Sequence, residues 1–157
     1  MIKVLFVCLG NICRSPMAEA VFRSHVEKAG LSDRIVVDSA GTGDWHVGHP
    51  PHEGTRKILE QYGIDYTGMF ARQVSKEDFY DFQYIIAMDD MNVTNLAPYF
   101  PADRKVEVKK MLEFVPKHAG GNVPDPYFTG NFEEVYEMVN EGCENLLNYI
   151  QDEQELG

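Results

Sequence analysis

The sequence has no long apolar run. The run from Val4 to Leu9 is too short for the apolar core of a signal peptide and far too short to span a bilayer, and no longer run follows it. We therefore predict a cytoplasmic protein that has no membrane partner.

Positive charge is scarce as well. The 14 lysines and arginines face 25 aspartates and glutamates, which gives a formal net charge of -11 at pH 7. Surfaces that neutralise nucleic-acid phosphates or anionic lipids need the opposite balance. We therefore expect no nucleic-acid partner, and any anion that the protein binds has to be held by a local group of donors.

Cysteine is rare, and the usual metal-ligand pairs are missing from the sequence. Three cysteines, an odd number, argue against a secreted disulfide framework and leave free thiols as the expectation. They and the five histidines show no C-x2-C or H-x3-H pair, so we predict neither a metal nor another cofactor. His46, His49 and His52 share one loop and the start of a helix, and we interpret them as solvated residues or as part of a substrate rim.

Apolar runs and helical periodicities alternate along the 157 residues, without a repeat or a linker. A serine that can cap a helix, Ser15, precedes Pro16, which suits the first helical position. Such alternation predicts one α/β domain over residues 1–157, with a flavodoxin-like parallel four-stranded sheet in the order 2-1-3-4 and helices on both faces. The expected strands cover 2–7, 35–37, 84–88 and 106–108, and the expected helices cover 15–29, 52–62, 91–96 and 132–150.

The first expected strand ends in a loop that can hold an anion, Cys8-Leu9-Gly10-Asn11-Ile12-Cys13-Arg14. Its backbone N–H groups and the N-terminus of the next helix favour negative charge. Gly10 and Asn11 allow the tight, left-handed backbone that such a cradle needs. Arg14 can offer a two-pronged donor to two oxygens of a phosphate. The same positive field stabilises a thiolate at Cys8, which makes Cys8 the candidate nucleophile.

A candidate proton donor lies near the other end of the chain. Asp125 stands between two prolines, which present its carboxylate rigidly, and a phosphate ester needs such a group to protonate its leaving oxygen. Tyr127 and Phe128 follow closely and can flank an aryl group. Trp45, in a loop rich in glycine, histidine and proline, is the candidate for the opposite wall.

Together these motifs resemble the low molecular weight protein tyrosine phosphatases, and the resemblance covers essentially the whole chain. One position departs from it, because Met69 stands where many eukaryotic members have a histidine of the network that braces the loop. The segments that carry the resemblance are Cys8 to Glu19, Ser39 to Thr42, Asp44-Trp45, Ala71-Arg72-Gln73, Met88-Asp89 and Asp125-Pro126-Tyr127.

The resemblance implies a metal-free protein-tyrosine-phosphatase that works through a phosphocysteine. In that scheme Cys8 attacks phosphorus, Arg14 and the loop amides bind the phosphoryl oxygens, and Asp125 protonates the leaving phenolate and then activates water. Asn11 and Ser39 brace the loop, and the hydroxyl of Ser15 donates a hydrogen bond to the thiolate. The substrate-binding residues that it implies are Leu9, Gly10, Asn11, Ile12, Cys13, Ser15, Trp45, Tyr127 and Phe128. It also implies phosphotyrosine-containing proteins as partners and inorganic phosphate and other oxyanions as inhibitors, and we expect a monomer.

Two other classes of protein remain open. Arsenate reductases of the same fold share the Cys-x5-Arg loop but relay electrons through further cysteines, and here none lies between Cys13 and Cys143. A phosphocysteine carrier or a silent phosphate-binding module would not need the acid Asp125. Turnover of an aryl phosphate distinguishes the enzyme from such a module.

Two side chains of the loop lead to finer hypotheses. We expect Cys13 to form a disulfide with Cys8 after peroxide has oxidised Cys8 to a sulfenic acid. We expect Ile12 to pack against an aromatic ring, which favours phosphotyrosine over phosphoserine, phosphothreonine and phosphoarginine. Members of the resembling family that act on phosphoarginine typically carry threonine at this position.

Overall fold

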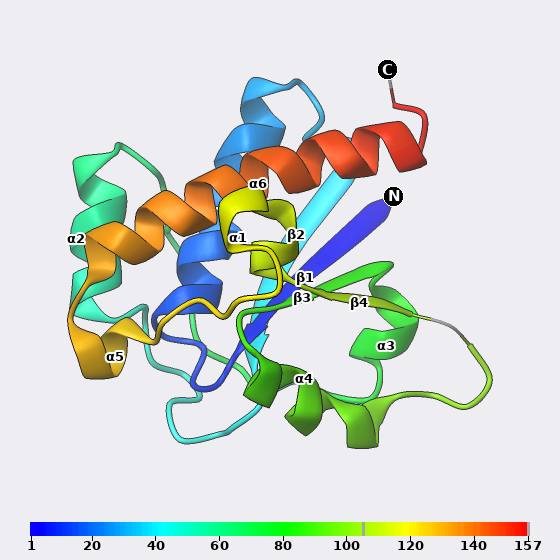
Figure 1. Ribbon diagram of the computed structural model, residues 1–157, viewed down its shortest axis with the longest axis horizontal. Coiled ribbons are helices and arrows are strands. Elements are labelled where there is room, and N and C mark those ends of the chain that lie inside the picture. Colours follow the sequence, from blue (N-terminus) through cyan, green and yellow to red (C-terminus); the bar gives the residue numbers. More distant parts are fainter. Residues whose placement is uncertain (105, 157) are drawn as a thin grey trace.

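Four parallel strands form one sheet in the computed structural model, which describes residues 1–104 and 106–156 (Figure 1). Their order, β2-β1-β3-β4, is the predicted one, and the expectation of a single α/β domain is confirmed. The predicted second strand was too short, because β2 continues to Gly41 and pairs with β1 as far as Cys8. The strands are β1 (Ile2–Cys8), β2 (Ile35–Gly41), β3 (Tyr84–Ala87) and β4 (Glu107–Lys110).

Helices cover both faces of this sheet. The four helices that the sequence predicts are present. Further short helices lie in segments whose sequence shows no helical periodicity. The predicted helices are α1 (Arg14–Lys28), α2 (Glu53–Gln61), α4 (Asp90–Leu96) and α6 (Phe132–Glu153). The additional ones are α3 (Asp78–Asp81), α5 (Pro126–Thr129), and the 3-10 helices η1 (Ala97–Tyr99), η2 (Met111–Phe114) and η3 (Pro116–His118).

From Val4 to Cys8 the central strand β1 is buried on both faces, which explains why this part of its sequence is a continuous apolar run. Val4 and Phe6 belong to the larger hydrophobic cluster, which includes residues of α1, α2 and α6. Leu5 and Val7 belong to a second cluster on the opposite face, which includes residues of α3 and α4. The strand is therefore fixed from both sides, and its carboxyl end at Cys8 has little freedom to move.

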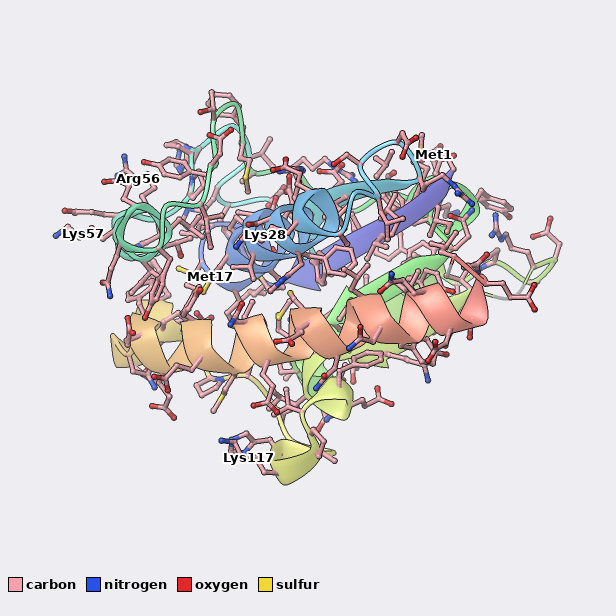
Figure 2. All side chains as sticks on the ribbon, turned by 90° about the horizontal axis from the view of Figure 1, so that it is seen from above. Met1, Met17, Lys28, Arg56, Lys57 and Lys117 are labelled. Carbon is pink, nitrogen blue, oxygen red and sulfur yellow. The ribbon has the colours of Figure 1, made fainter. Side chains whose placement is uncertain are left out.

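The long helices α1 and α6 pack together on one side of the sheet, and Figure 2 shows Met17 on the side of α1 that faces α6. Met17 is completely buried, and so is Cys143 of α6. The apolar stripe of α6 predicts a core position for Cys143, and that prediction is confirmed. No helix within residues 1–104 and 106–156 is both long and apolar enough to cross a bilayer.

The start of α1 differs from the sequence prediction. The helix begins at Arg14 with Cys13 in the capping position, and no side chain caps it. Ser15 is therefore not the N-cap, because its hydroxyl lies within hydrogen-bond distance of Cys8 and Asn11 instead. Pro16 still lies in the first turn, where a missing N–H costs the helix no hydrogen bond.

Candidate active site

The loop between β1 and α1 curls around the sulfur of Cys8. The backbone N–H of Asn11 points at Cys8 Sγ over 3.3 Å, and Ser15 Oγ lies 3.0 Å from the same sulfur. Asn11 has a φ of 56°, the left-handed conformation that the sequence led us to expect at this position. Cys8 is only 3% exposed and lies at the N-terminal end of α1, where the helix dipole favours negative charge.

The side chain of Asn11 holds this loop in shape. Its Nδ2 donates to Ser15 Oγ over 2.7 Å and to Ser39 Oγ over 2.9 Å, and its Oδ1 accepts from the backbone N–H of Arg72 over 3.0 Å. Because Ser15 Oγ accepts from Asn11, its own proton is free to be donated to Cys8 Sγ. Two donors thus point at the sulfur, an arrangement that suits a thiolate.

Gly41 brings the end of β2 against the back of the same loop. A Cβ atom at this position would lie 2.8 Å from the carbonyl oxygen of Leu9 and 3.2 Å from the backbone nitrogen of Asn11. Backbone hydrogen bonds from Thr42 to Cys8 and from Gly43 to Leu9 complete the contact. Only glycine permits this approach of the two segments.

The hydrogen-bond network extends from the loop to a buried carboxylate, Glu19. Ser39 Oγ donates to Glu19 Oε1 over 2.6 Å, and Arg23 donates to the other carboxylate oxygen. Burial raises the pKa of Glu19, and the hydrogen bonds from Ser39 and Arg23 partly offset that effect. Nη1 of Arg23 also lies 3.9 Å from Met69 Sδ. The positive charge of this network therefore comes from Arg23, which lies next to Met69. This role of Arg23 was not predicted from the sequence.

Arg14 is buried between two carboxylates at the other side of the loop. Its Nη1 donates to Asp89 Oδ2 over 2.6 Å and to the carbonyl oxygen of Val123 over 3.0 Å, and its Nη2 lies 3.4 Å from Asp125 Oδ2. Burial opposes the charge of Arg14, but the charges of Cys8, Asp125 and Asp89 outweigh it and raise the pKa of the guanidinium. Within the described residues, the buried Nε of Arg14 has no hydrogen-bond partner.

Asp89, which the sequence offered only as part of the Met88-Asp89 segment of the resemblance, has two roles in the structure. One of its oxygens accepts from the backbone N–H of Asn92 over 2.8 Å and caps α4, while the other holds Arg14. An aspartate at a helix start beyond the carboxyl end of a strand was the available signal.

A pocket of about 230 Å³ opens in front of the Cys8 sulfur. Nine of its lining residues are among those that the sequence analysis named as catalytic or substrate-binding, and His46 is the tenth. Asn11, Arg14 and Ser15 are not among its lining residues, because their side chains are buried and engaged in contacts with neighbouring residues. The lining residues are Cys8, Leu9, Gly10, Ile12, Cys13, Trp45, His46, Asp125, Tyr127 and Phe128.

Asp125 stands at this pocket as the N-cap of α5. Its Oδ1 accepts from the backbone N–H of Tyr127 over 3.1 Å, while its Oδ2 faces Arg14. The aromatic rims are exposed, with Trp45 at 68% and Phe128 at 74%. One oxygen of the carboxylate is thus fixed by the helix, and the other pairs with Arg14.

Cys13 has different surroundings from Cys8, although both belong to the same loop and both are free thiols. Burial, together with the charges of Cys8 and Asp125, raises the pKa of the Cys13 thiol to about 12, against a lowering effect of Arg14. Cys13 is therefore protonated at neutral pH. Across residues 1–104 and 106–156, no group of three or more His, Cys, Asp or Glu side chains is arranged to hold a metal ion.

The first strand of a 2-1-3-4 parallel sheet ends in a cysteine-centred loop, a carboxylate lies at the same pocket, and a buried arginine contacts that carboxylate. These features define a class of α/β proteins with a candidate anion-binding site. Comparison with known proteins identifies the family within that class. The family model described as low molecular weight phosphotyrosine protein phosphatase matches residues 3–156. The chain belongs to this family, and the prediction of an enzyme of this kind is confirmed.

Individual relatives agree with this result. The chain is 54% identical over 156 residues to the low molecular weight protein-tyrosine-phosphatase YfkJ of Bacillus subtilis, covering 99% of this chain and 100% of the relative. It is 52% identical over 150 residues to PtpA of Staphylococcus epidermidis, covering 96% and 94% of the two chains. The crystal structure of YfkJ superimposes with a TM-score of 0.93 over 98% of this chain and 96% of YfkJ, at 55% identity. A Drosophila arginine phosphatase does so with a TM-score of 0.86 over 96% of this chain and 98% of its own, at 36% identity.

Proposed function

We propose that the protein hydrolyses phosphotyrosine in proteins by way of a phosphocysteine on Cys8. The observation that carries this proposal is the sulfur itself, which receives two hydrogen-bond donors and lies at a pocket that Asp125 also lines. The family and the names of its relatives support a protein-tyrosine phosphatase.

In the first step, the Cys8 thiolate attacks the phosphorus of phosphotyrosine. A bond forms between sulfur and phosphorus while the bond between phosphorus and the phenolic oxygen breaks. Asp125, in its protonated form, gives its proton to that oxygen, so that tyrosine leaves as a neutral phenol. The products of this step are the phosphocysteine and an ionised Asp125.

In the second step, water hydrolyses the phosphocysteine. Asp125 takes a proton from the water as its oxygen attacks phosphorus, and the sulfur–phosphorus bond breaks. Inorganic phosphate leaves, the Cys8 thiolate is restored, and Asp125 is protonated again. Substrate and water thus become tyrosine and phosphate, without any further reactant.

Arg14 is the group that we assign to the phosphoryl oxygens. Its guanidinium is already held at the loop by Asp89, and its buried Nε has no partner among the described residues. Planar, two-pronged donors of this kind match two oxygens of a phosphate and stabilise the charge of the transition state. Because the same donors would bind any tetrahedral oxyanion, inorganic phosphate and related anions are expected to compete with the substrate. The cytoplasmic location and the monomeric state stay predictions.

The alternative of an arsenate reductase is less well supported. Such an enzyme would need a further cysteine within reach of the loop, and the remaining one, Cys143, lies fully buried in α6. Burial raises the pKa of that thiol, and its Sγ lies 3.7 Å from the backbone carbonyl of Ala18.

The proposed intermediate can be trapped. We expect the wild-type protein, mixed with excess aryl phosphate and quenched with acid within milliseconds, to carry one phosphoryl group on the peptide that contains Cys8. Peptide mass spectrometry locates the group, and the Cys13→Ser variant serves as the matched control within the same loop. Turnover without any phosphoryl group on Cys8, under conditions that preserve a thiophosphate, would contradict the covalent mechanism.

Ile12 is the residue that we expect to select phosphotyrosine over phosphoarginine. Its side chain lines the pocket, and an apolar group there offers no partner to a guanidinium. A structural relative is named an arginine phosphatase, so both activities occur on this fold. We expect Ile12→Thr to shift the ratio of kcat/KM for phosphoarginine over that for phosphotyrosine upwards by about tenfold, the value of one hydrogen bond.

The matched control is Ile12→Val, since valine has the shape of threonine without its hydroxyl. For both variants and the wild type, the ratio of kcat/KM values is measured on peptides that differ only in the phosphorylated residue. If valine moves the ratio as far as threonine does, or if the wild type already prefers phosphoarginine, the side chain at position 12 does not select the substrate. The capture of oxidised Cys8 by Cys13 also stays a prediction.

A further inference from the structure

Lys110, the last residue of β4, holds two segments of the site that are distant in sequence. Its ammonium group donates to the carbonyl oxygen of Gly120 over 3.0 Å and to Asn122 Oδ1 over 3.2 Å, and it lies 2.9 Å from Asp90 Oδ1. These three contacts match the three donors of a lysine. The side chain of Lys110 is only 13% exposed, whereas lysine is usually a surface residue.

Asn122 completes the connection. Its Oδ1 accepts from Lys110 and also from the backbone N–H of Asp90 over 3.0 Å. The ion pair with Lys110 lowers the pKa of Asp90, so the carboxylate is ionised at neutral pH. Lysine, carboxylate and amide therefore form one cluster, which we call the Lys110 clamp: Lys110, Asp90 and Asn122.

Two members of the Lys110 clamp, Asp90 and Asn122, are adjacent in sequence to residues that contact Arg14. Asp90 follows Asp89, which holds Arg14, while Asn122 precedes Val123. Val123 accepts a hydrogen bond from Arg14 through its carbonyl oxygen, and its N–H donates to Met88 over 2.9 Å. The stiff Pro124 separates Val123 from the carboxylate of Asp125.

We propose that Lys110 is a positioning residue, which fixes the place of Asp125 relative to Arg14 and so sets the efficiency of proton transfer to the leaving group. This inference rests on the proposed role of Asp125 as the general acid. The segment from Ala119 to Asp125 contains no strand or helix, and the Lys110 clamp holds its middle. Without the lysine, the carbonyl of Gly120 and the amide of Asn122 lose a charged donor, and the segment is free to turn about Val123.

The test uses substrates that differ in their need for an acid. Phenyl phosphate releases a basic phenolate and depends on protonation, whereas 2,4-dinitrophenyl phosphate releases a stable anion and does not. We expect Lys110→Met to lower kcat/KM about tenfold on phenyl phosphate and less than about twofold on the dinitrophenyl ester. The loss on phenyl phosphate is smaller than the ~10²- to 10⁴-fold that a general acid contributes, because the acid is still present but less well placed. Lys110→Arg, which keeps the charge, should recover most of the loss.

Lys117→Met is the matched control. This lysine lies in η3, in the same connection between β4 and Asp125, and Figure 2 shows it pointing away from the body of the protein. In the described part of the chain its side chain makes no hydrogen bond or ion pair, so Lys117→Met should leave the turnover of both substrates unaffected. Equal losses on both substrates with Lys110→Met would mean that the lysine only supports the fold, and would overturn the proposal.

A double-mutant cycle separates this proposal from the one on which it rests. In an Asp125→Asn background, Lys110→Met should cause no further loss on phenyl phosphate, because the group that it positions is gone. Additive losses overturn the positioning role, while a loss from Asp125→Asn that is equal on both substrates overturns the general acid itself. Asn122→Ala removes the acceptor instead of the lysine and should repeat the substrate-dependent loss; if Lys110→Met does not fold, this variant decides the matter.

Discussion

Cys8→Ser is expected to lower turnover of aryl phosphates by at least about 10⁴-fold, because a serine hydroxyl at this position has no base that could ionise it. The two donors at the sulfur, the N–H of Asn11 and the hydroxyl of Ser15, stabilise an anion. Neither group can act as the base that removes the proton of a serine hydroxyl at position 8. The rest of the loop that we propose to bind the phosphoryl group is kept in this variant. Inorganic phosphate should therefore still bind, as isothermal titration would show.

Cys143→Ser is the control for this experiment, since it makes the same exchange of sulfur for oxygen in the core of α6. It should retain the specific activity of the wild type wherever it remains folded, which circular dichroism establishes. Appreciable turnover by Cys8→Ser, after correction for contaminating phosphatase, would falsify the assignment of the nucleophile. Loss of phosphate binding together with turnover would instead indicate that the loop had collapsed.

The arrangement of the sheet and the position of the loop could be predicted, because both depend on local patterns. The uninterrupted apolar run of β1 from Val4 onwards predicts a strand buried on both faces, and hydrophobic clusters do cover both faces. The loop from Cys8 to Arg14 joins the end of that strand to a helix, so its place at the carboxyl edge follows from the order of the elements. Asp125 was a candidate on a different ground, because two prolines present its carboxylate rigidly.

The partners of the buried charges could not be predicted in this way. Arg14 pairs with Asp89 across 75 positions of the chain, and nothing local to either residue specifies the other. Arg23 next to Met69 is a similar case, because a methionine gives no sign that an arginine supplies the charge beside it. The predicted cap of α1 was wrong for the same reason. Serine is a residue type that often caps helices, but the hydroxyl of Ser15 contacts Cys8 and Asn11 instead.

The second large effect is expected from Asp125→Asn, which removes the proposed acid and keeps the shape of its side chain. The asparagine oxygen can still accept the hydrogen bond from the N–H of Tyr127, so the cap of α5 is retained. On phenyl phosphate, kcat/KM should fall by about 10²- to 10⁴-fold, the range of a general acid. On 2,4-dinitrophenyl phosphate the loss should be about tenfold or less, since that leaving group departs without a proton.

Asp125→Asn should also slow the second step, because no carboxylate is left to take the proton of water. With the dinitrophenyl ester, the first turnover is then expected to be fast and the later ones slow, so that a burst of phenol appears and phosphocysteine accumulates on Cys8. Asp44→Asn is the matched control, since it removes one exposed carboxylate from the loop that carries Trp45. A loss that is equal for both esters, with no burst, would show that Asp125 supports the pocket without transferring protons.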